Sequence, residues 1–175
     1  MNICRATACC FTGHRPDKLP ADEKPLRACL RQLIHAAAAD GIRDFLCGMA
    51  LGADRLAAEE VLALKKSGAP VRLIAALPCP QQAARWSPAD RRRYTQLLAQ
   101  TDGQYVACEQ YTPYCMNARN LWMVEHASRV IAVFDGSSGG TANTLRRARE
   151  QQLDILLIHP VTLAVTHEPT ARRFE

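Results

Sequence analysis

The sequence predicts an α/β protein, a three-layer α/β/α sandwich with a parallel, doubly wound sheet of five to seven strands. Short apolar runs alternate with helical patterns from one end of the chain to the other. The runs are apolar throughout, as in strands that helices cover on both faces, and strands alternating with helices form parallel sheets. The chain has 175 residues, 48% of them hydrophobic and 22% charged, which fits one globular domain.

The elements of the first half follow from their apolar spacing. Strands are expected at residues 3–11, 44–47 and 71–77. A helix is expected between the first two, over residues 22–39, because its leucines and Ile34 recur at a period of 3.6. The next helix buries small and branched residues on one face and ends at Gly68. The first strand should be central, with the next two stepping away to one side.

The second half repeats the alternation. Ser87-Pro88-Ala89-Asp90 is typical of a capping box with proline at the first helical position, so a helix should run from there to about Gln100. Further helices are expected at 116–127 and after Thr141. The remaining strands are expected at residues 104–108, 129–134 and 154–159. Residues 1–160 are interpreted as a single domain, and 161–175 as either an edge strand or a tail.

Charge and cysteine usage limit the function classes. Lys and Arg number 22 against 17 Asp and Glu, a net +5, which suits an anionic ligand. The basic residues are scattered, which disfavours a dedicated nucleic-acid binder. The eight cysteines form no Cys-x-x-Cys pair, so we expect free thiols, no metal and a reducing cytoplasm. No signal peptide and no run of about 20 apolar residues is visible, so no membrane partner is expected.

Glycine-bearing loops indicate where a ligand would bind. Six of the nine glycines follow predicted strands, in three loops: Gly13; Gly48 and Gly52; Gly136, Gly139 and Gly140. The loops after parallel strands meet at one edge of the sheet, where ligands bind. Glycine lets the backbone approach an anion, and a helix N-terminus adds positive charge. Neither the Gly-x-Gly-x-x-Gly fingerprint nor a Walker A loop is present.

Three motifs resemble those of YpsA-like proteins. They are Phe11-Thr12-Gly13-His14-Arg15-Pro16, the stretch Gly48 to Asp54, and Gly139-Gly140-Thr141. YpsA-like proteins belong to the SLOG superfamily, a Rossmann-like group that includes DprA and the Lonely Guy phosphoribohydrolases. The similarity covers about residues 9 to 160. It implies a Rossmann-like fold and a nucleotide or nucleotide-derived ligand under the glycine loops, with no settled reaction.

The Lonely Guy enzymes provide a sharper comparison. Their pattern has Met-x-x-Arg-Lys-x-x-Met before a strand and then Gly-Gly-x-Gly-Thr-x-x-Glu. This chain keeps the arginine as Arg119, in the stretch Met116 to Met123. Thr144 stands where those enzymes have their catalytic glutamate, and it cannot act as a carboxylate. The resemblance implies that phosphate binding is retained, while a carboxylate such as Asp135 or Glu125 would have to replace the missing one.

Several candidate side chains allow two interpretations. Arg119 either contacts a phosphate or forms a salt bridge, and it is expected at the surface of the cleft, as is Gly140. His14 and Arg15 follow the first strand, where His14 is either a hydrogen-bonded loop residue or a ligand contact. Asp54 caps a helix or meets a ribose hydroxyl.

Residues of the last glycine loop and the aromatic side chains also allow two interpretations. Asp135 is either a ligand or catalytic carboxylate, or a turn residue satisfying local amides. Thr141, and Thr144 further along, would cap the helix or bind phosphate. Trp86 and Tyr111 either stack on a base or pack against the protein. The basic run at residues 91–93 is interpreted as a solvated helix face.

Three functions remain open at this point. The leading one is binding of a nucleotide or nucleotide derivative, as a sensor or carrier, by a chain that could also form a homo-oligomer. The second is hydrolysis of the N-glycosidic bond of a nucleoside monophosphate. The third, by analogy with DprA, is single-stranded DNA binding, which the 6% aromatic content disfavours. The ligand-binding prediction comprises Thr12, Gly13, His14, Arg15, Gly48, Gly52, Asp54, Arg119, Asp135, Gly139, Gly140, Thr141 and Thr144.

Overall fold

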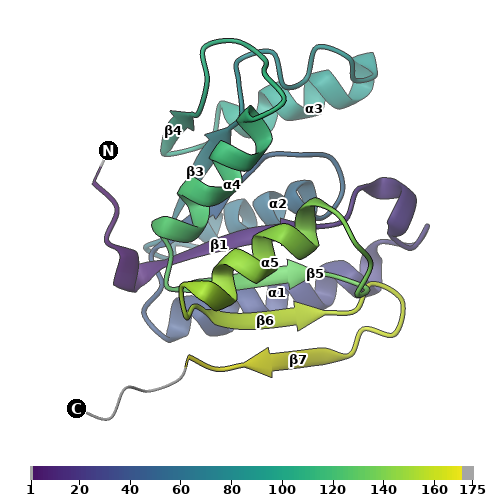
Figure 1. Cartoon of the computed structure of the whole chain (residues 1–175). Helices are drawn as coiled ribbons and strands as arrows, with labels where there is room; N and C mark the ends of the chain where they lie inside the picture. Colours follow the sequence, from purple (N-terminus) through teal and green to yellow (C-terminus); the bar gives the residue numbers. More distant parts are fainter. Residues whose placement is uncertain (1, 171–175) are drawn as a thin grey trace.

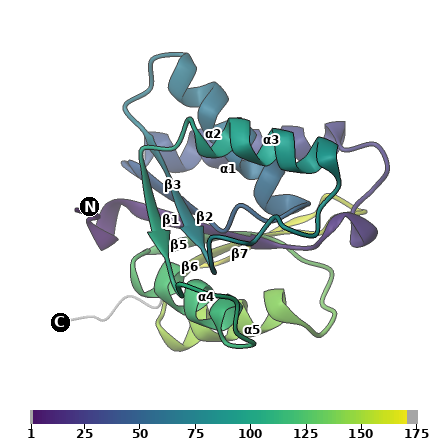
Figure 2. The ribbon, with the colours of Figure 1, turned by 90° about the horizontal axis from the view of Figure 1, so that it is seen from above.

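The computed structural model describes residues 2–170 and shows a seven-stranded sheet between two layers of helices (Figures 1 and 2). The strands are β1 (Ala8–Gly13), β2 (Asp44–Cys47), β3 (Arg72–Leu77), β4 (Gly103–Val106), β5 (Arg129–Val133), β6 (Asp154–Ile158) and β7 (Val165–Glu168). Their order is β4-β3-β2-β1-β5-β6-β7. The first six are parallel, and β7 pairs antiparallel with β6. The predicted fold class and the central position of the first strand are confirmed.

Within residues 2–170, five α-helices cover the sheet. They are α1 (Lys24–Ala39), α2 (Ala53–Lys66), α3 (Pro88–Leu98), α4 (Cys115–Glu125) and α5 (Gly140–Glu150). Figure 2 shows α1, α2 and α3 on one face of the sheet and α4 and α5 on the other. No helix within residues 2–170 combines the length and the apolar character that crossing a membrane requires.

Two apolar cores lie on either side of the sheet because neighbouring strand residues point to opposite faces. Cys9 and Phe11 pack towards α1 and α2. Cys10, between them in the sequence, packs with Met123 and Leu145 of α4 and α5. Burial on both faces is the physical reason why the strands are apolar throughout instead of alternating.

The start of the first strand differs from the sequence-based expectation. The first strand begins at Ala8 and not at Ile3, because Arg5–Thr7 form a 3-10 turn. Arg5 donates a hydrogen bond from Nε to the Ala127 carbonyl oxygen (3.1 Å), which draws this turn to the start of β5. At the other end, β7 is an edge strand, which confirms one of the two alternatives expected for the segment after residue 160; residues 171–175 lie outside the described part.

Capping explains where α3 begins. The Ser87 hydroxyl oxygen accepts a hydrogen bond from the Asp90 backbone N–H (3.1 Å), as the capping box predicts. The reciprocal bond differs, because the Ser87 hydroxyl also donates to the Asp90 carboxylate (2.6 Å). In a standard capping box the side chain at this position would accept from the backbone N–H of Ser87. Here the Asp90 carboxylate accepts from the Ser87 hydroxyl instead.

Candidate functional site

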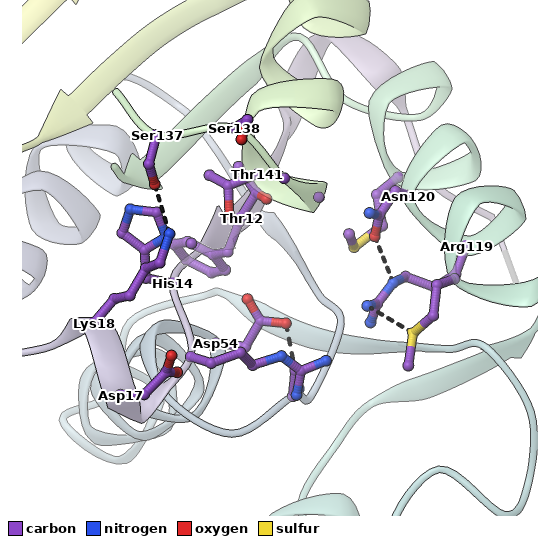
Figure 3. Close-up of a pocket in the computed structure, with 18 residues that line it drawn as sticks. Thr12, His14, Asp17, Lys18, Asp54, Arg119, Asn120, Ser137, Ser138 and Thr141 are labelled. Atoms are coloured by element: carbon purple, nitrogen blue, oxygen red, sulfur yellow. Dashed lines mark hydrogen bonds between the residues drawn. The ribbon is translucent and has the colours of Figure 1, made fainter. Parts of the chain in front are cut away.

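The strand order reverses between β1 and β5, which places their following loops side by side. The two strands are in register, with Gly13 opposite Val133 at their carboxyl ends. β2 continues the sheet on one side of β1, whereas β5 starts the second half on the other. In open α/β sheets a crevice forms at such a switch point. A cleft of about 360 Å³ lies there (Figure 3).

Three walls form this cleft. Residues 11–15, 17 and 18, at the end of β1 and beyond it, form the first. Residues 137–141, between β5 and α5, form the second. The third comes from α4, with Ala50 and Asp54 beneath it. Nine of the thirteen predicted site residues line the cleft: Thr12, Gly13, His14, Arg15, Asp54, Arg119, Gly139, Gly140 and Thr141.

The first turn of α5 presents unpaired backbone donors to the cleft. Gly139 precedes the helix in a backbone conformation with φ +142°, and no side chain caps the helix. Within the described chain, the first amide of this turn with a protein acceptor is that of Asn143, bonded to the Gly139 carbonyl (3.0 Å). The N–H groups of Gly140, Thr141 and Ala142 are left without one, and such a terminus attracts anions.

A lysine and a histidine from the β1 side contact the loop that precedes α5. Lys18 donates from Nζ to the Ser137 hydroxyl (2.7 Å), which links the loop after β1 to the loop after β5 (Figure 3). His14 is buried, and its Nε2 lies 2.7 Å from Oδ1 of Asp135. Hydrogen bonds from Ser137 hold the pKa of Asp135 well below its usual range, and His14 adds to the effect. Asp135 is thus an ionised turn residue that orients His14 and does not itself line the cleft.

Asp54 brings a carboxylate to the opposite side of the cleft. It lies in the first turn of α2, where Oδ2 accepts a hydrogen bond from the Ala50 backbone N–H (3.3 Å). It therefore caps the preceding loop and not the helix. Burial raises the pKa of Asp54, although the nearby Arg119 guanidinium lowers it. An exposed carboxylate, Asp17, also lines the cleft.

Arg119 is buried in the wall of the cleft, so the expectation that it lies at the cleft surface is wrong. Only 5% of the residue is exposed. Its Nη1 donates to the carbonyl oxygens of Gly48 (2.5 Å) and Ala76 (3.2 Å), and its Nε donates to Oδ1 of Asn120 (2.7 Å). Desolvation lowers the pKa of Arg119, whereas Asp54 raises it. Through Nη1, Arg119 holds the loop after β2 and the end of β3 together.

The two glycines of the loop after β2 shape the protein and do not line the cleft. A Cβ on Gly48 would lie 1.9 Å from Nη1 of Arg119. Gly52 has φ +89°, and a Cβ there would lie 2.4 Å from the His14 carbonyl oxygen. That carbonyl accepts the Ala53 backbone N–H (3.1 Å), which fastens the start of α2 to the loop after β1.

Comparison with known proteins agrees with this architecture. The sequence model of the YspA SLOG family (YpsA) matches residues 9–163. The chain belongs to the YspA SLOG family. The SPbeta prophage-derived protein YoqJ of Bacillus subtilis (strain 168) is 32% identical over 130 residues, which cover 66% of this chain and 76% of YoqJ.

Two solved structures of DNA processing protein A (DprA) share the fold. The protein from Streptococcus pneumoniae has a TM-score of 0.62 at 20% identity, over 87% of this chain and 50% of that one. The protein from Helicobacter pylori, described by its single-stranded DNA binding mode, has a TM-score of 0.59 at 23% identity, over 86% and 64%. The chain thus spans half of the pneumococcal protein.

Thr144 of this YspA SLOG protein points away from the cleft. The residue is buried, with 1% exposed, and its hydroxyl donates to the Gly140 carbonyl oxygen (2.9 Å). The two carboxylates considered as substitutes for it, Asp135 and Glu125, do not line the cleft either. Asp54 is the buried carboxylate that does.

Sequence reasoning missed several cleft residues. They are Phe11, Asp17, Lys18, Met116, Asn120, Met123, Ser137 and Ser138. For α4 a signal was available: Met116, Arg119, Asn120 and Met123 are spaced i, i+3, i+4, i+7, which places them on one helix face. No sequence pattern near Lys18 predicts that it lines the cleft, because its contact with Ser137 depends on the pairing of β1 with β5.

The aromatic and basic candidates lie outside this cleft. Trp86 packs edge-on against Tyr94 with ring centres 5.2 Å apart, and it does not line the cleft. Tyr111 is 68% exposed. In the basic run, Arg93 pairs with Glu59 (2.6 Å).

Proposed function

We propose that this protein binds a nucleotide or nucleotide-derived ligand in the β1–β5 cleft, as a sensor or carrier, with a phosphate against the first turn of α5. The unpaired amides of Gly140, Thr141 and Ala142 carry this proposal. They act together with the helix dipole, equivalent to roughly half a positive charge at the N-terminus. Lys18 and Arg15 add positive charge at the same mouth.

The rest of the cleft suits the remainder of a nucleotide. Asp54 is an acceptor for a sugar hydroxyl, as an acidic residue is in many nucleotide sites. The half-buried Met116 supplies apolar surface for a ring. A volume of about 360 Å³ falls in the range of roughly 300–1,000 Å³ that is usual for small-molecule sites.

Gly140 offers a direct test by calorimetry. A Cβ at this position would meet nothing within 4 Å, so Gly140→Asp should fold normally. An acidic residue in the first turn is itself favourable by about 0.3–1 kcal/mol. The variant places a carboxylate where the phosphate should bind, whereas Gly140→Ala adds bulk without charge and serves as the matched control.

The ligand is first sought by thermal shift with nucleoside monophosphates, ADP-ribose and NAD. For the best of these we expect Gly140→Asp to weaken binding at least tenfold, with a smaller change in Gly140→Ala. Equal affinity of the wild type and Gly140→Asp would place the ligand elsewhere. Binding of a single-stranded oligonucleotide, with none of the small molecules, would favour a DNA-binding function.

A second candidate function, N-glycosidic hydrolysis, is favoured by Asp54. A buried carboxylate with a raised pKa inside a cleft is the arrangement that general acid–base chemistry requires. If the protein hydrolyses a nucleoside monophosphate, Asp54→Asn should abolish release of the base. Glu125→Gln, which changes an exposed carboxylate outside the cleft, is the matched control and should retain activity. Binding without base release in the wild type would leave the sensor or carrier function.

A further inference from the structure

One face of α4 forms the end of the cleft that lies away from α5. Met116, Arg119, Asn120 and Met123 follow one another at helical spacing and all line the cleft. Figure 3 shows Asn120 and Arg119 together on this wall, across the cleft from Thr141 in the first turn of α5. Whatever part of a ligand extends away from the first turn of α5 therefore meets this face.

The Asn120 side-chain amide has a fixed orientation. Nε of Arg119 donates a hydrogen bond of 2.7 Å to it. Since a guanidinium can only donate, the atom that it faces must be the amide oxygen. Arg119 is held in turn by the carbonyl oxygens of Gly48 and Ala76. The amide thus cannot turn over without losing a buried contact.

The other half of the Asn120 amide is open. Nδ2 has no hydrogen-bond partner among the described residues, and Asn120 is half-buried at the cleft wall. Among the described residues, the hydrogen-bond acceptor of Nη2 of Arg119 is the Met116 sulfur, a weak acceptor, at 3.7 Å. Both open groups are donors, so this end of the cleft offers hydrogen atoms to a ligand that presents acceptors.

Charge and apolar surface narrow the class of acceptor. Asp54 faces the same part of the cleft, and its carboxylate would repel a second anion there (Figure 3). Met116, which is half-buried, lines the cleft beside the donors with a flexible apolar side chain. An uncharged ring that carries a carbonyl oxygen or a ring nitrogen matches these features, whereas a phosphate does not.

We infer that Asn120 is a specificity-determining residue, whose Nδ2 donates to an acceptor on the base of the bound nucleotide. This inference rests on the proposed function, because the phosphate must lie at α5 for the base to reach α4. Nucleotides whose base offers an acceptor at that edge bind better than those that present a donor. Ribose 5-phosphate, which has no base, does not use Asn120.

Asn120→Asp tests the two N–H donors of Nδ2 separately from the rest of the side chain. The variant keeps an oxygen for Nε of Arg119 and has the same shape, so only the Nδ2 donors are lost and a charge is gained. Asn117→Asp, at an exposed position of the same helix outside the cleft, adds the same charge and is the matched control. The probes are ribose 5-phosphate and the tightest binder among AMP, GMP, CMP and UMP, titrated by calorimetry.

We expect Asn120→Asp to weaken the nucleoside monophosphate at least tenfold more than ribose 5-phosphate, and Asn117→Asp to change both less than twofold. Equal losses for both probes, or no loss for either, would overturn the inference while leaving the proposed function standing. If the wild type binds neither probe, the proposed function fails first and the inference with it.

A second measurement needs no variant. In the wild type the Nδ2 proton resonances of Asn120 should shift when the nucleoside monophosphate binds and stay in place with ribose 5-phosphate. A shift with both probes would show that Asn120 responds to the phosphate or sugar, which contradicts the assignment.

Discussion

The loops after β2 and β5 carry similar glycine signatures, but different atoms surround them. In the loop after β2, the space beside Gly48 is occupied by the Arg119 guanidinium, and Gly52 lies against the loop after β1. In the loop after β5, a Cβ on Gly139 or Gly140 would meet nothing within 4 Å. One loop is therefore closed by the protein's own groups, and the other is open to a ligand. A glycine after a strand indicates that another group comes close to the backbone. Only the surrounding atoms show whether that group belongs to the protein or to a ligand.

The largest expected effect is on the closed loop. Gly48→Ala places a Cβ 1.9 Å from Nη1 of Arg119 and 2.6 Å from Oδ2 of Asp54. The guanidinium must move and abandon its carbonyl partners, so we expect a loss of about 3 kcal/mol in unfolding free energy. Urea denaturation measures this. An unchanged midpoint would show that the loop is not packed as described.

Removing the side chain that fills the closed loop should cost slightly less. Arg119→Met keeps much of the volume but leaves the buried carbonyls of Gly48 and Ala76 without their donor. We expect a loss of about 2 kcal/mol, because an unpaired buried acceptor costs roughly 1–3 kcal/mol. Arg92→Met, at an exposed position of α3, is the control and should change stability by less than about 0.5 kcal/mol.

The pKa values of the two carboxylates, Asp54 and Asp135, should be shifted in opposite directions. Burial raises the pKa of Asp54, and hydrogen bonds from Ser137 lower that of Asp135. The native state therefore holds the Asp54 proton to higher pH than the unfolded chain does, and stability through this group falls as pH rises through its native pKa. For Asp135 the stabilisation is present above the unfolded pKa and is lost as pH falls towards the native one.

Carbon-detected NMR titration of the two side chains checks this contrast. Asp54 should change protonation above the usual range for aspartate, and Asp135 should stay ionised below it. Asp54→Asn should be more stable than the wild type at neutral pH, with the difference shrinking in acid. Two coincident titrations at the ordinary value would contradict the different environments of the loops.

The smallest effect is expected in the open loop. Gly140→Ala meets no atom and needs no left-handed backbone, so it restricts the unfolded chain without strain. Such changes stabilise a protein by about 0.4–1 kcal/mol. Thermal unfolding followed by circular dichroism should show a small rise. A fall comparable to that of Gly48→Ala would remove the distinction between the loops.

The fold could be predicted because each of its causes is local or periodic. Strands buried on both faces appear as unbroken apolar runs, and α1 shows its buried stripe through Leu26, Leu30 and Ile34. The convergence of loops follows from a parallel sheet. The start of the first strand was placed too early, because Arg5 anchors a turn through a bond to Ala127, which lies 122 residues away.

The site could be predicted only in outline, because its details depend on distant side chains. Arg119 turns inward to the carbonyl of Gly48, 71 residues away, and no spacing in the sequence encodes that choice. Thr144 does not line the cleft, and its hydroxyl donates to the Gly140 carbonyl oxygen within α5. Lys18 and Asn120 enter the cleft through the pairing of β1 with β5 and the rotation of α4.

The central claim is that an anionic group of the ligand lies on the first turn of α5 and not on the loop after β2. Backbone amide NMR of the wild type, titrated with the nucleotide that stabilises it most, tests this directly. The account predicts large shifts at Gly140, Thr141 and Ala142 and little change at Gly48 and Gly52, which do not line the cleft. Large shifts at Gly48 and Gly52, with the α5 amides unmoved, would contradict it.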